Sequence, residues 1–159
     1  MNVVKPTEQA KKLKNLGKGD KTKYAYDGPF PELLEYFLNS QPDRNYVVQF
    51  KSDEFNSLCP KTGAPDQANY LLRYVPGKKC IESKSFKLYL MSYRNAGAFM
   101  ERITNDIIND LVKVLQPKGM TLEMDFNSRG GIGTVIYSEY IDYDLSDDEF
   151  DAVSSCLGI

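Results

Sequence analysis

The stretch from Phe99 to Phe126 changes its apolar period once, and this change limits the folds that the chain can adopt. Apolar side chains recur at every fourth residue as far as Leu115, as they do on one face of an α-helix, and Pro117 ends the pattern. From Met120 onwards apolar and polar residues alternate, which is the period of a half-buried strand. The chain therefore combines a long amphipathic helix with a sheet that has one buried face.

The other patterns complete an order of strand, strand, helix, helix, strand, strand. These elements are predicted at residues 46–51, 68–75, 83–94, 98–116, 120–126 and 132–141. Such an order predicts an α+β fold in which a four-stranded antiparallel sheet carries both helices on one face (ββααββ). Because the edges of this sheet would be open, pairing between subunits into a barrel-like ring is expected.

This domain is predicted to span residues 24–141, with a different kind of segment on each side. Residues 1–23 are rich in lysine and have little apolar pattern, as expected for a solvated arm. Residues 142–159 carry many carboxylates and are expected to form a solvated acidic tail. Near the start of the domain, residues 32–37 follow Pro31 and are expected to form a short helical turn.

The composition excludes several classes of function. The chain has no histidine, which rules out Ser-His-Asp and Cys-His catalysis and histidine-liganded zinc. Its three cysteines, Cys59, Cys80 and Cys156, lack the paired spacing of a zinc site, and their odd number disfavours a disulfide framework. We therefore expect reduced thiols and no metal, with acid–base work left to carboxylates, lysine, tyrosine, cysteine or water.

The charge and hydropathy of the chain bear on its partners and location. The formal net charge of -2 gives no overall attraction to nucleic acid or to acidic membranes. No segment has the apolar length that spans a bilayer, and the first residues lack the features of a signal peptide. We expect a cytoplasmic protein with no membrane and no direct nucleic-acid partner, in which any anionic ligand is held by a local cluster.

Cys59 is the candidate nucleophile, in a turn that is rich in proline and glycine. A thiolate needs electropositive or hydrogen-bonding surroundings, which Lys61 and the amides of the turn can supply. Asp66 lies seven residues further on and can return across the turn as a general acid. The alternatives are a buried structural cysteine and an aspartate that only caps a turn.

Charged side chains on the predicted helices and hairpin are candidate binding groups. Lys84 and Lys87 share one face of a helix and can bind phosphates together, although such a pair is usually solvated surface. Arg129 precedes two glycines and offers a second anion site, or simply a hairpin turn. Glu82 and Glu101 lie near helix starts, where they can cap the helix or accept paired N–H groups from a purine-like edge.

Several motifs, taken in order, carry a resemblance to a known family. They are Phe55-x-Ser57-Leu58-Cys59-Pro60-x-Thr62-Gly63-x-Pro65-Asp66, Glu82-Ser83-Lys84-Ser85-Phe86-Lys87-Leu88-Tyr89, Arg94-Asn95, Phe99, Glu101 and Arg129-Gly130-Gly131-Ile132. Over roughly residues 24–141 the chain resembles the short, single-module NADPH-dependent 7-cyano-7-deazaguanine reductases. The resemblance implies the tunnelling fold and a homo-oligomer of rings stacked face to face, two pentamers being one such arrangement, with active sites at subunit boundaries.

The same resemblance implies the chemistry. The family reduces the nitrile of 7-cyano-7-deazaguanine to the amine of 7-aminomethyl-7-deazaguanine, a precursor of the tRNA nucleoside queuosine. It implies that Cys59 attacks the nitrile carbon to form a thioimide while Asp66 protonates the nitrogen, and that two NADPH supply hydride. The family positions associated with the cofactor phosphates match Lys84, Lys87 and Arg129. Those that hold the deazaguanine match Glu82, Ser83 and Glu101.

One segment departs from the family pattern. The family reads Arg-Asn-His-Gly-x-Phe-His-Glu, whereas this chain has Ala96 and Met100 at the two histidine positions. Because Met100 cannot donate a proton, water or Tyr93 is left as the replacement, and reduction is expected to be slower by a factor of about 10² to 10⁴.

Two alternatives follow from this departure. Relatives of the family add ammonia to the same thioimide and form the amidine of archaeosine. They generally lack the cofactor motif, so the intact segment from Glu82 to Tyr89 favours reduction. The other alternative is a non-catalytic protein that binds the deazaguanine without turnover.

Overall fold

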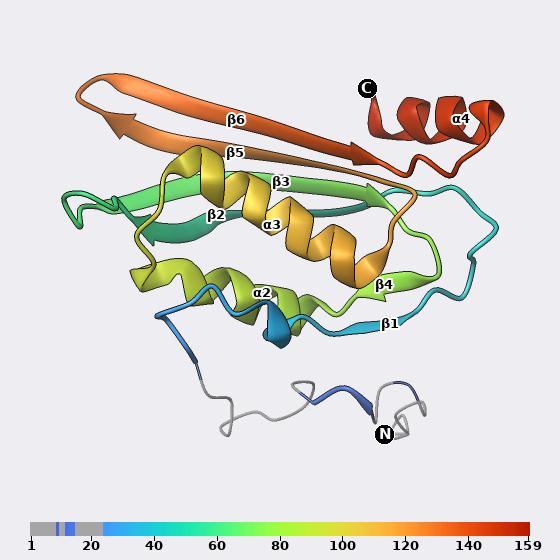
Figure 1. Cartoon of the computed structure of the whole chain (residues 1–159), viewed down its shortest axis with the longest axis horizontal. Helices are drawn as coiled ribbons and strands as arrows, with labels where there is room; N and C mark the ends of the chain where they lie inside the picture. The colour runs from blue at the N-terminus through green and yellow to red at the C-terminus, as the bar shows by residue number, and fades with distance from the viewer. Residues whose placement is uncertain (1–8, 10–11, 15–23) are drawn as a thin grey trace, which may run out of the picture.

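The computed structural model describes residues 9, 12–14 and 24–159, and its centre is one antiparallel sheet with helices on one face (Figure 1). The four strands lie in the order β2-β3-β5-β6. Their bounds are Val48–Leu58 for β2, Pro65–Val75 for β3, Gly119–Arg129 for β5 and Ile132–Ile141 for β6. Helices α2 (Ser83–Ser92) and α3 (Met100–Leu115) cover one face. The predicted α+β class and the ββααββ order are confirmed, whereas most of the lysine-rich arm predicted at residues 1–23 lies outside the described residues.

The main core lies between the sheet and these two helices, as the apolar periods predict. Strand β5 contributes the alternating series from Met120 to Phe126, all of it buried. Helix α3 contributes the apolar side chains that recur at every fourth position from Ile103 to Leu115, and these side chains face the sheet. A single left-handed residue, Gln116, ends α3 and turns the chain back into β5. This connection makes the end of α3 and the start of β5 one rigid corner.

A second, two-stranded sheet was not predicted. Strand β1 (Tyr36–Leu38) pairs in antiparallel fashion with β4 (Lys79–Ile81). The helical turn predicted at residues 32–37 is therefore wrong beyond Leu33, because only a short 3-10 turn, Pro31–Leu33, forms there. The extended chain satisfies its backbone groups by pairing with β4 instead of within its own turn.

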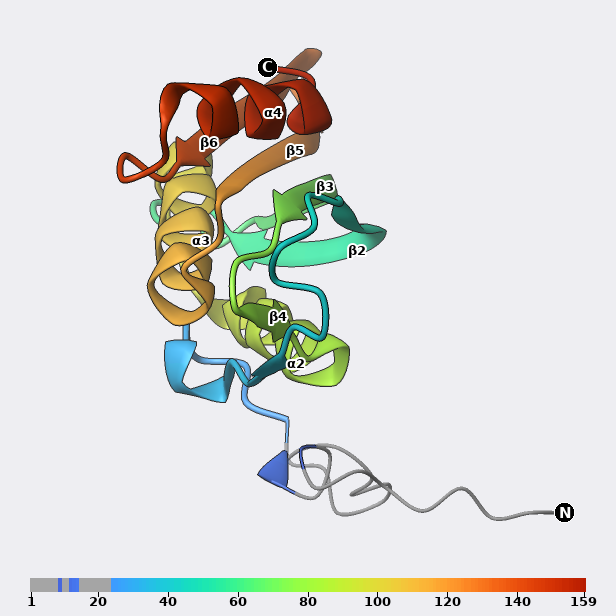
Figure 2. The same cartoon turned by 90° about the vertical axis from the view of Figure 1, so that its right-hand side faces the viewer.

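The segment 142–159, expected to be a solvated acidic tail, contains helix α4 (Asp147–Leu157). A capping box between Ser146 and Glu149 begins the helix. The side chains of Val153 and Leu157 are fully buried in a small cluster with Val75. Because Val75 alternates with the core residues of β3, this cluster lies on the other face of the sheet. The segment is thus a packed helix with a solvated acidic side rather than a free tail (Figure 2).

Candidate active site

Cys59 lies in the tight turn that joins β2 to β3. Its amide donates to the carbonyl of Ala64 at 2.8 Å, and its carbonyl accepts from the amide of Gly63 at 2.9 Å. Gly63 has a φ of 69°, a left-handed conformation that glycine adopts without strain. The local sequence therefore fixes the backbone on both sides of the nucleophile, and its side chain is only half-buried.

The segment that precedes α3 packs directly on this turn. The amide of Leu58 donates to the carbonyl of Ala96 at 3.0 Å, and the amide of Ala98 donates back to the carbonyl of Leu58 at 3.2 Å. A Cβ atom on Gly97 would lie 3.3 Å from the Cα of Pro60, so a larger residue would press on the turn. These contacts bring the first turn of α3, with Met100 and Glu101, to the same end of the molecule as Cys59 (Figure 1).

Asp66 and Arg129 meet at this end. Asp66 lies in β3 opposite Ser57 of β2, and only 3% of its side chain is exposed. Arg129 is the last residue of β5, and its guanidinium forms an ion pair with the Asp66 carboxylate. The same guanidinium hydrogen-bonds to the Cys59 sulfur. A thiol, a carboxylate and a guanidinium from three strand ends therefore form one cluster, which we call the Cys59 cluster.

Hydrogen bonds to sulfur lower the pKa of Cys59 to about 6. The largest contribution comes from the Thr62 hydroxyl, followed by the backbone amides of Lys61 and Thr62 and then by the Arg129 guanidinium. The thiolate, which is the attacking species, therefore predominates at neutral pH. This environment matches a reactive cysteine and differs from that of Cys80, which is buried.

Ser57 belongs to the same site although the prediction gave it no role. Its side chain is fully buried, and its hydroxyl has no hydrogen-bond partner among the described residues. Side chains on directly opposed residues of an antiparallel pair share one face, so Ser57 and Asp66 are neighbours. A buried hydroxyl without a partner is costly, and a bound ligand could satisfy it. The signal in the sequence is its position two residues before Cys59.

Glu82 caps α2 with both of its carboxylate oxygens. One oxygen accepts from the amide of Lys84 at 2.9 Å and the other from the amide of Ser85 at 2.7 Å, and the residue is buried. This geometry satisfies two helix amides that have no partner within the helix. The capping interpretation of Glu82 thus accounts for both of its carboxylate oxygens, whereas Glu101 is exposed in the first turn of α3.

The other predicted residues on α2 are not beside Cys59 within this chain. Glu82, Ser83 and Lys84 lie at the start of α2, and Figure 1 shows that this end of α2 is opposite to the turn between β2 and β3. Lys87 lies one turn further along and lines a groove of about 390 Å³ together with Arg94. Asp53 and Glu54 also line this groove, so it carries charges of both signs. The two cations that line it, Lys87 and Arg94, are of the kind that binds phosphates.

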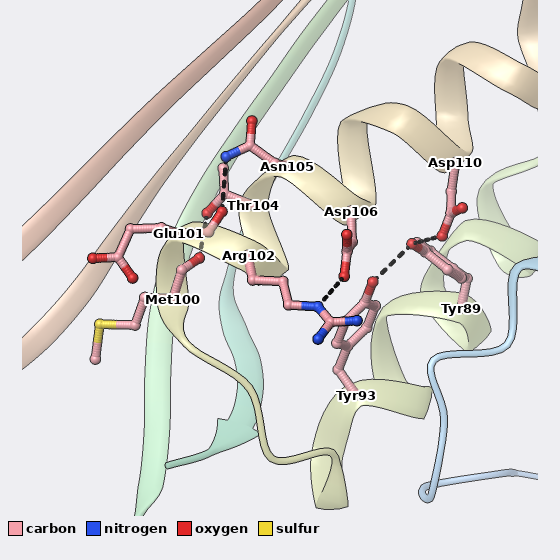
Figure 3. A network of polar contacts seen from close by, with 9 residues as sticks. All are labelled: Tyr89, Tyr93, Met100, Glu101, Arg102, Thr104, Asn105, Asp106 and Asp110. Carbon is pink, nitrogen blue, oxygen red and sulfur yellow. Dashed lines mark hydrogen bonds and ion pairs between the residues drawn. The ribbon is translucent and has the colours of Figure 1, made fainter. Parts of the chain in front are cut away.

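The contacts and burial of Tyr93 bear on the prediction that it replaces the missing imidazole. Its hydroxyl hydrogen-bonds to that of Tyr89 at 3.0 Å, and Tyr89 donates to Asp110 at 2.6 Å. Figure 3 shows Met100 and Glu101 extending away from this network. Burial raises the pKa of Tyr93 above its ordinary value, so the hydroxyl is a weaker acid than usual. The sequence alternative in which Tyr93 supplies the proton is therefore disfavoured by its burial and its bonding.

Two further properties of the described part of the chain concern metal ions and membranes. It contains no group of three or more cysteine, aspartate or glutamate residues placed to hold a metal ion. None of the helices in residues 24–159 is long and apolar enough to cross a membrane.

Comparison with known proteins places these observations in a family. A family model described as QueF-like protein matches residues 65–144. A relative from Chloroherpeton thalassium is 47% identical over 110 residues, which is 69% of this chain and 95% of the relative. One from Nitrosococcus oceani is 50% identical over 67% of this chain and 83% of the relative. One from Bacillus cereus is 48% identical over 75% of this chain and 72% of the relative. Each of the three is named NADPH-dependent 7-cyano-7-deazaguanine reductase.

A solved structure supports the fold. The archaeosine synthase QueF-Like in its apo form superposes with a TM-score of 0.55 over 58% of this chain and 91% of that chain. At 19% identity the likeness concerns the fold alone, and it confirms the tunnelling fold implied by the motifs. With the family match and the extent of identity to the reductases, the chain belongs to the QueF family.

Proposed function

We propose that this chain reduces the nitrile of 7-cyano-7-deazaguanine to 7-aminomethyl-7-deazaguanine with NADPH. The observation that carries the proposal is the Cys59 cluster, which joins a thiolate to a buried carboxylate. It occurs in a chain that is 47% identical to a relative named for this reaction. The arrangement suits attack on a carbon electrophile with proton delivery to the atom beside it.

The capture step follows from the positions of Cys59 and Asp66. The Cys59 sulfur forms a bond to the nitrile carbon, and one electron pair of the triple bond moves to the nitrogen. That nitrogen takes a proton through Asp66, from the thiol or from water, and the product is a thioimide. Asp66 passes the proton on and is unchanged at the end of the step.

The cations on α2 suit a cofactor that carries phosphates. Lys84 and Lys87 lie on one side of α2, and Arg94 lines the groove with Lys87. Each NADPH would supply one hydride when bound, so two NADPH would be used in turn for each nitrile. We assign Lys84, Lys87 and Arg94 to binding and orientation.

The substrate site is proposed to lie between subunits. Glu101 lies in the first turn of α3, which is at the same end of the molecule as the turn that holds Cys59, whereas Glu82 and Ser83 lie at the far end of α2. If all three hold one deazaguanine ring, they must come from different subunits. A homo-oligomeric ring would bring the two ends together, and its open sheet edges are β2 and β6.

A second candidate function is favoured by Met100. Its thioether cannot transfer a proton, so the chain could capture the nitrile at Cys59 and reduce the adduct slowly or not at all. In that case the protein would be a deazaguanine-binding protein with a covalent ligand.

One experiment separates these functions. The protein is incubated with 7-cyano-7-deazaguanine, with and without NADPH and with and without ammonia, and the products and adducts are identified by mass. Amine formed with two NADPH oxidised per nitrile supports reduction. Amidine formed with ammonia and no NADPH oxidation supports the ammonia-adding alternative, and a lasting adduct alone supports the binding protein. Cys59→Ala should abolish every covalent outcome, whereas the matched variant Cys156→Ala, on α4, should behave like the unchanged protein.

A further inference from the structure

We infer that Arg129 is a positioning residue of the capture step, holding the Asp66 carboxylate and the Cys59 sulfur together before cofactor is needed. This role rests on the proposed function. It differs from the role that the resemblance implies for Arg129, which is to bind the cofactor phosphates.

The position of Arg129 is set by the hairpin between β5 and β6. Gly130 and Gly131 have φ values of 58° and 85°, as in a two-residue hairpin turn, and Arg129 pairs with Ile132 across it. The ladder between β5 and β6 shifts register between Phe126 and Arg129. Such an irregularity redirects side chains at the end of a strand. The hairpin therefore presents a guanidinium at the end of the sheet where the Cys59 turn lies.

A second contact holds this end of β5 against β3. The side-chain amide of Asn127 donates to that of Gln67 at 3.3 Å, one residue after Asp66. Asp66 is nearly inaccessible, whereas 40% of the Arg129 side chain is exposed. One part of the guanidinium therefore bonds to the carboxylate and the sulfur, and the rest faces solvent.

The chemistry of these groups explains why a guanidinium is needed there. A buried carboxylate without a partner is unfavourable, and a thiolate beside it adds a second negative charge. A guanidinium has five N–H donors and can bind both anions at once. During capture the sulfur bonds to carbon and the nitrogen is protonated through Asp66, so Arg129 stays a cation and exchanges no proton.

Few other charges lie near this cluster, and one of them is Glu101, which is exposed in the first turn of α3 at the same end of the molecule. The turn contributes Lys61, which bonds to sulfur through its backbone amide, β3 contributes Asp66, and the end of β5 contributes Arg129. The segment 96–98, which packs on the turn, has no titratable side chain. A change in the pH dependence of Cys59 reactivity on removal of Arg129 therefore reports on the loss of the guanidinium, together with the Asp66 charge that it leaves unpaired.

The test compares Arg129→Gln and Arg129→Lys with Arg102→Gln as a matched control. Arg102 also pairs with an aspartate, Asp106, but on the exposed side of α3. The rate at which iodoacetamide alkylates Cys59 is measured against pH on the full chain without cofactor, by mass of the Cys59 peptide. Capture of 7-cyano-7-deazaguanine without NADPH is timed in parallel.

We expect Arg129→Gln to move the alkylation profile to higher pH and to slow capture. A displacement of one pH unit lowers the rate at pH 6 about fivefold, because fewer molecules carry the thiolate. Arg129→Lys should restore part of both rates, and Arg102→Gln should change neither.

An unchanged alkylation profile and capture rate in Arg129→Gln, with only a higher KM for NADPH, would overturn this role. If Arg129→Gln does not fold, as judged by circular dichroism, the profile of Arg129→Lys decides in its place. If the unchanged protein captures no nitrile but its alkylation profile still depends on Arg129, the proposed function fails while the contact with the thiolate stands.

Discussion

Met100 occupies the first turn of α3 with a side chain that can neither donate nor accept a proton at neutral pH. We predict that Met100→His increases the rate of NADPH oxidation in a single turnover by about 10²-fold or more, because it supplies a general acid. Capture at Cys59 without cofactor should keep its rate. Met100→Leu is the matched control, and a histidine variant no faster than the leucine variant would show that the imidazole is not what limits reduction.

The Cys59 thiolate should be measurable in the free protein. Because the pKa of Cys59 is lowered to about 6, the thiolate forms as the pH rises through that value and is lost below it. Alkylation should therefore reach half of its maximum near pH 6, and Thr62→Val should move this midpoint towards the ordinary thiol value of about 8.5. Buried Cys80 is the internal control and should not be labelled in the native protein. A midpoint near pH 8.5 in the unchanged protein would contradict the hydrogen-bond argument.

At the scale of elements, α4 is held against the sheet by a few side chains, and these side chains are fully buried. Leu157→Ala should lower the free energy of unfolding by about 2 to 4 kcal/mol, since it leaves a cavity against Val75 and Val153. The matched change Phe150→Ala lies on the same helix at a residue that is 47% exposed, and it should cost less than about 0.5 kcal/mol. Chemical denaturation measures both, and equal effects would mean that α4 is not packed as described.

The elements also show what the sequence could and could not predict. The long periodic segments were predictable because burial of one face imposes a regular spacing, as from Ile103 to Leu115. Strand β1 was not, because its three residues are too short to show a period and depend on pairing with β4. Helix α4 did carry signals: Val153 and Leu157 are four residues apart, and Ser146 and Glu149 have the spacing of a capping box.

The same limit applies to the candidate site. Cys59 and Asp66 could be paired from the sequence because one short turn separates them. The ion pair of Asp66 with Arg129 could not, because it depends on the register between β3 and β5. The sequence also left two uses open for Glu82, and only the amides of Lys84 and Ser85 show that its carboxylate caps a helix.

At the scale of the whole molecule, β6 is an edge strand with exposed apolar side chains. Val135 is 61% exposed and Tyr137 is 51% exposed, which is unusual for large apolar groups on a free sheet edge. We predict that the chain forms a ring-like homo-oligomer and that Val135→Lys produces smaller species in analytical ultracentrifugation. Tyr143→Lys, at a position that is 96% exposed beyond β6, should leave the assembly intact.

Val135→Lys should change assembly and nitrile reduction but not the reactivity of Cys59. Val135→Lys should lose nitrile reduction, because the proposed site needs residues from two subunits, while Cys59 keeps its alkylation profile within one subunit. A monomeric variant that still reduces the nitrile at the full rate would place the whole site in a single chain.

The two backbone hydrogen bonds between Leu58 and the segment 96–98 have a consequence for how this molecule can change. They join the strand that ends at the nucleophile to the helix that begins beside Glu101, so a displacement of either is passed to the other. With the roles proposed for Glu101 and Cys59, ligand recognition and bond formation would be mechanically linked through these hydrogen bonds. Redesigning the protein to bind a ligand with a larger or smaller heterocycle would require both segments to be rebuilt together.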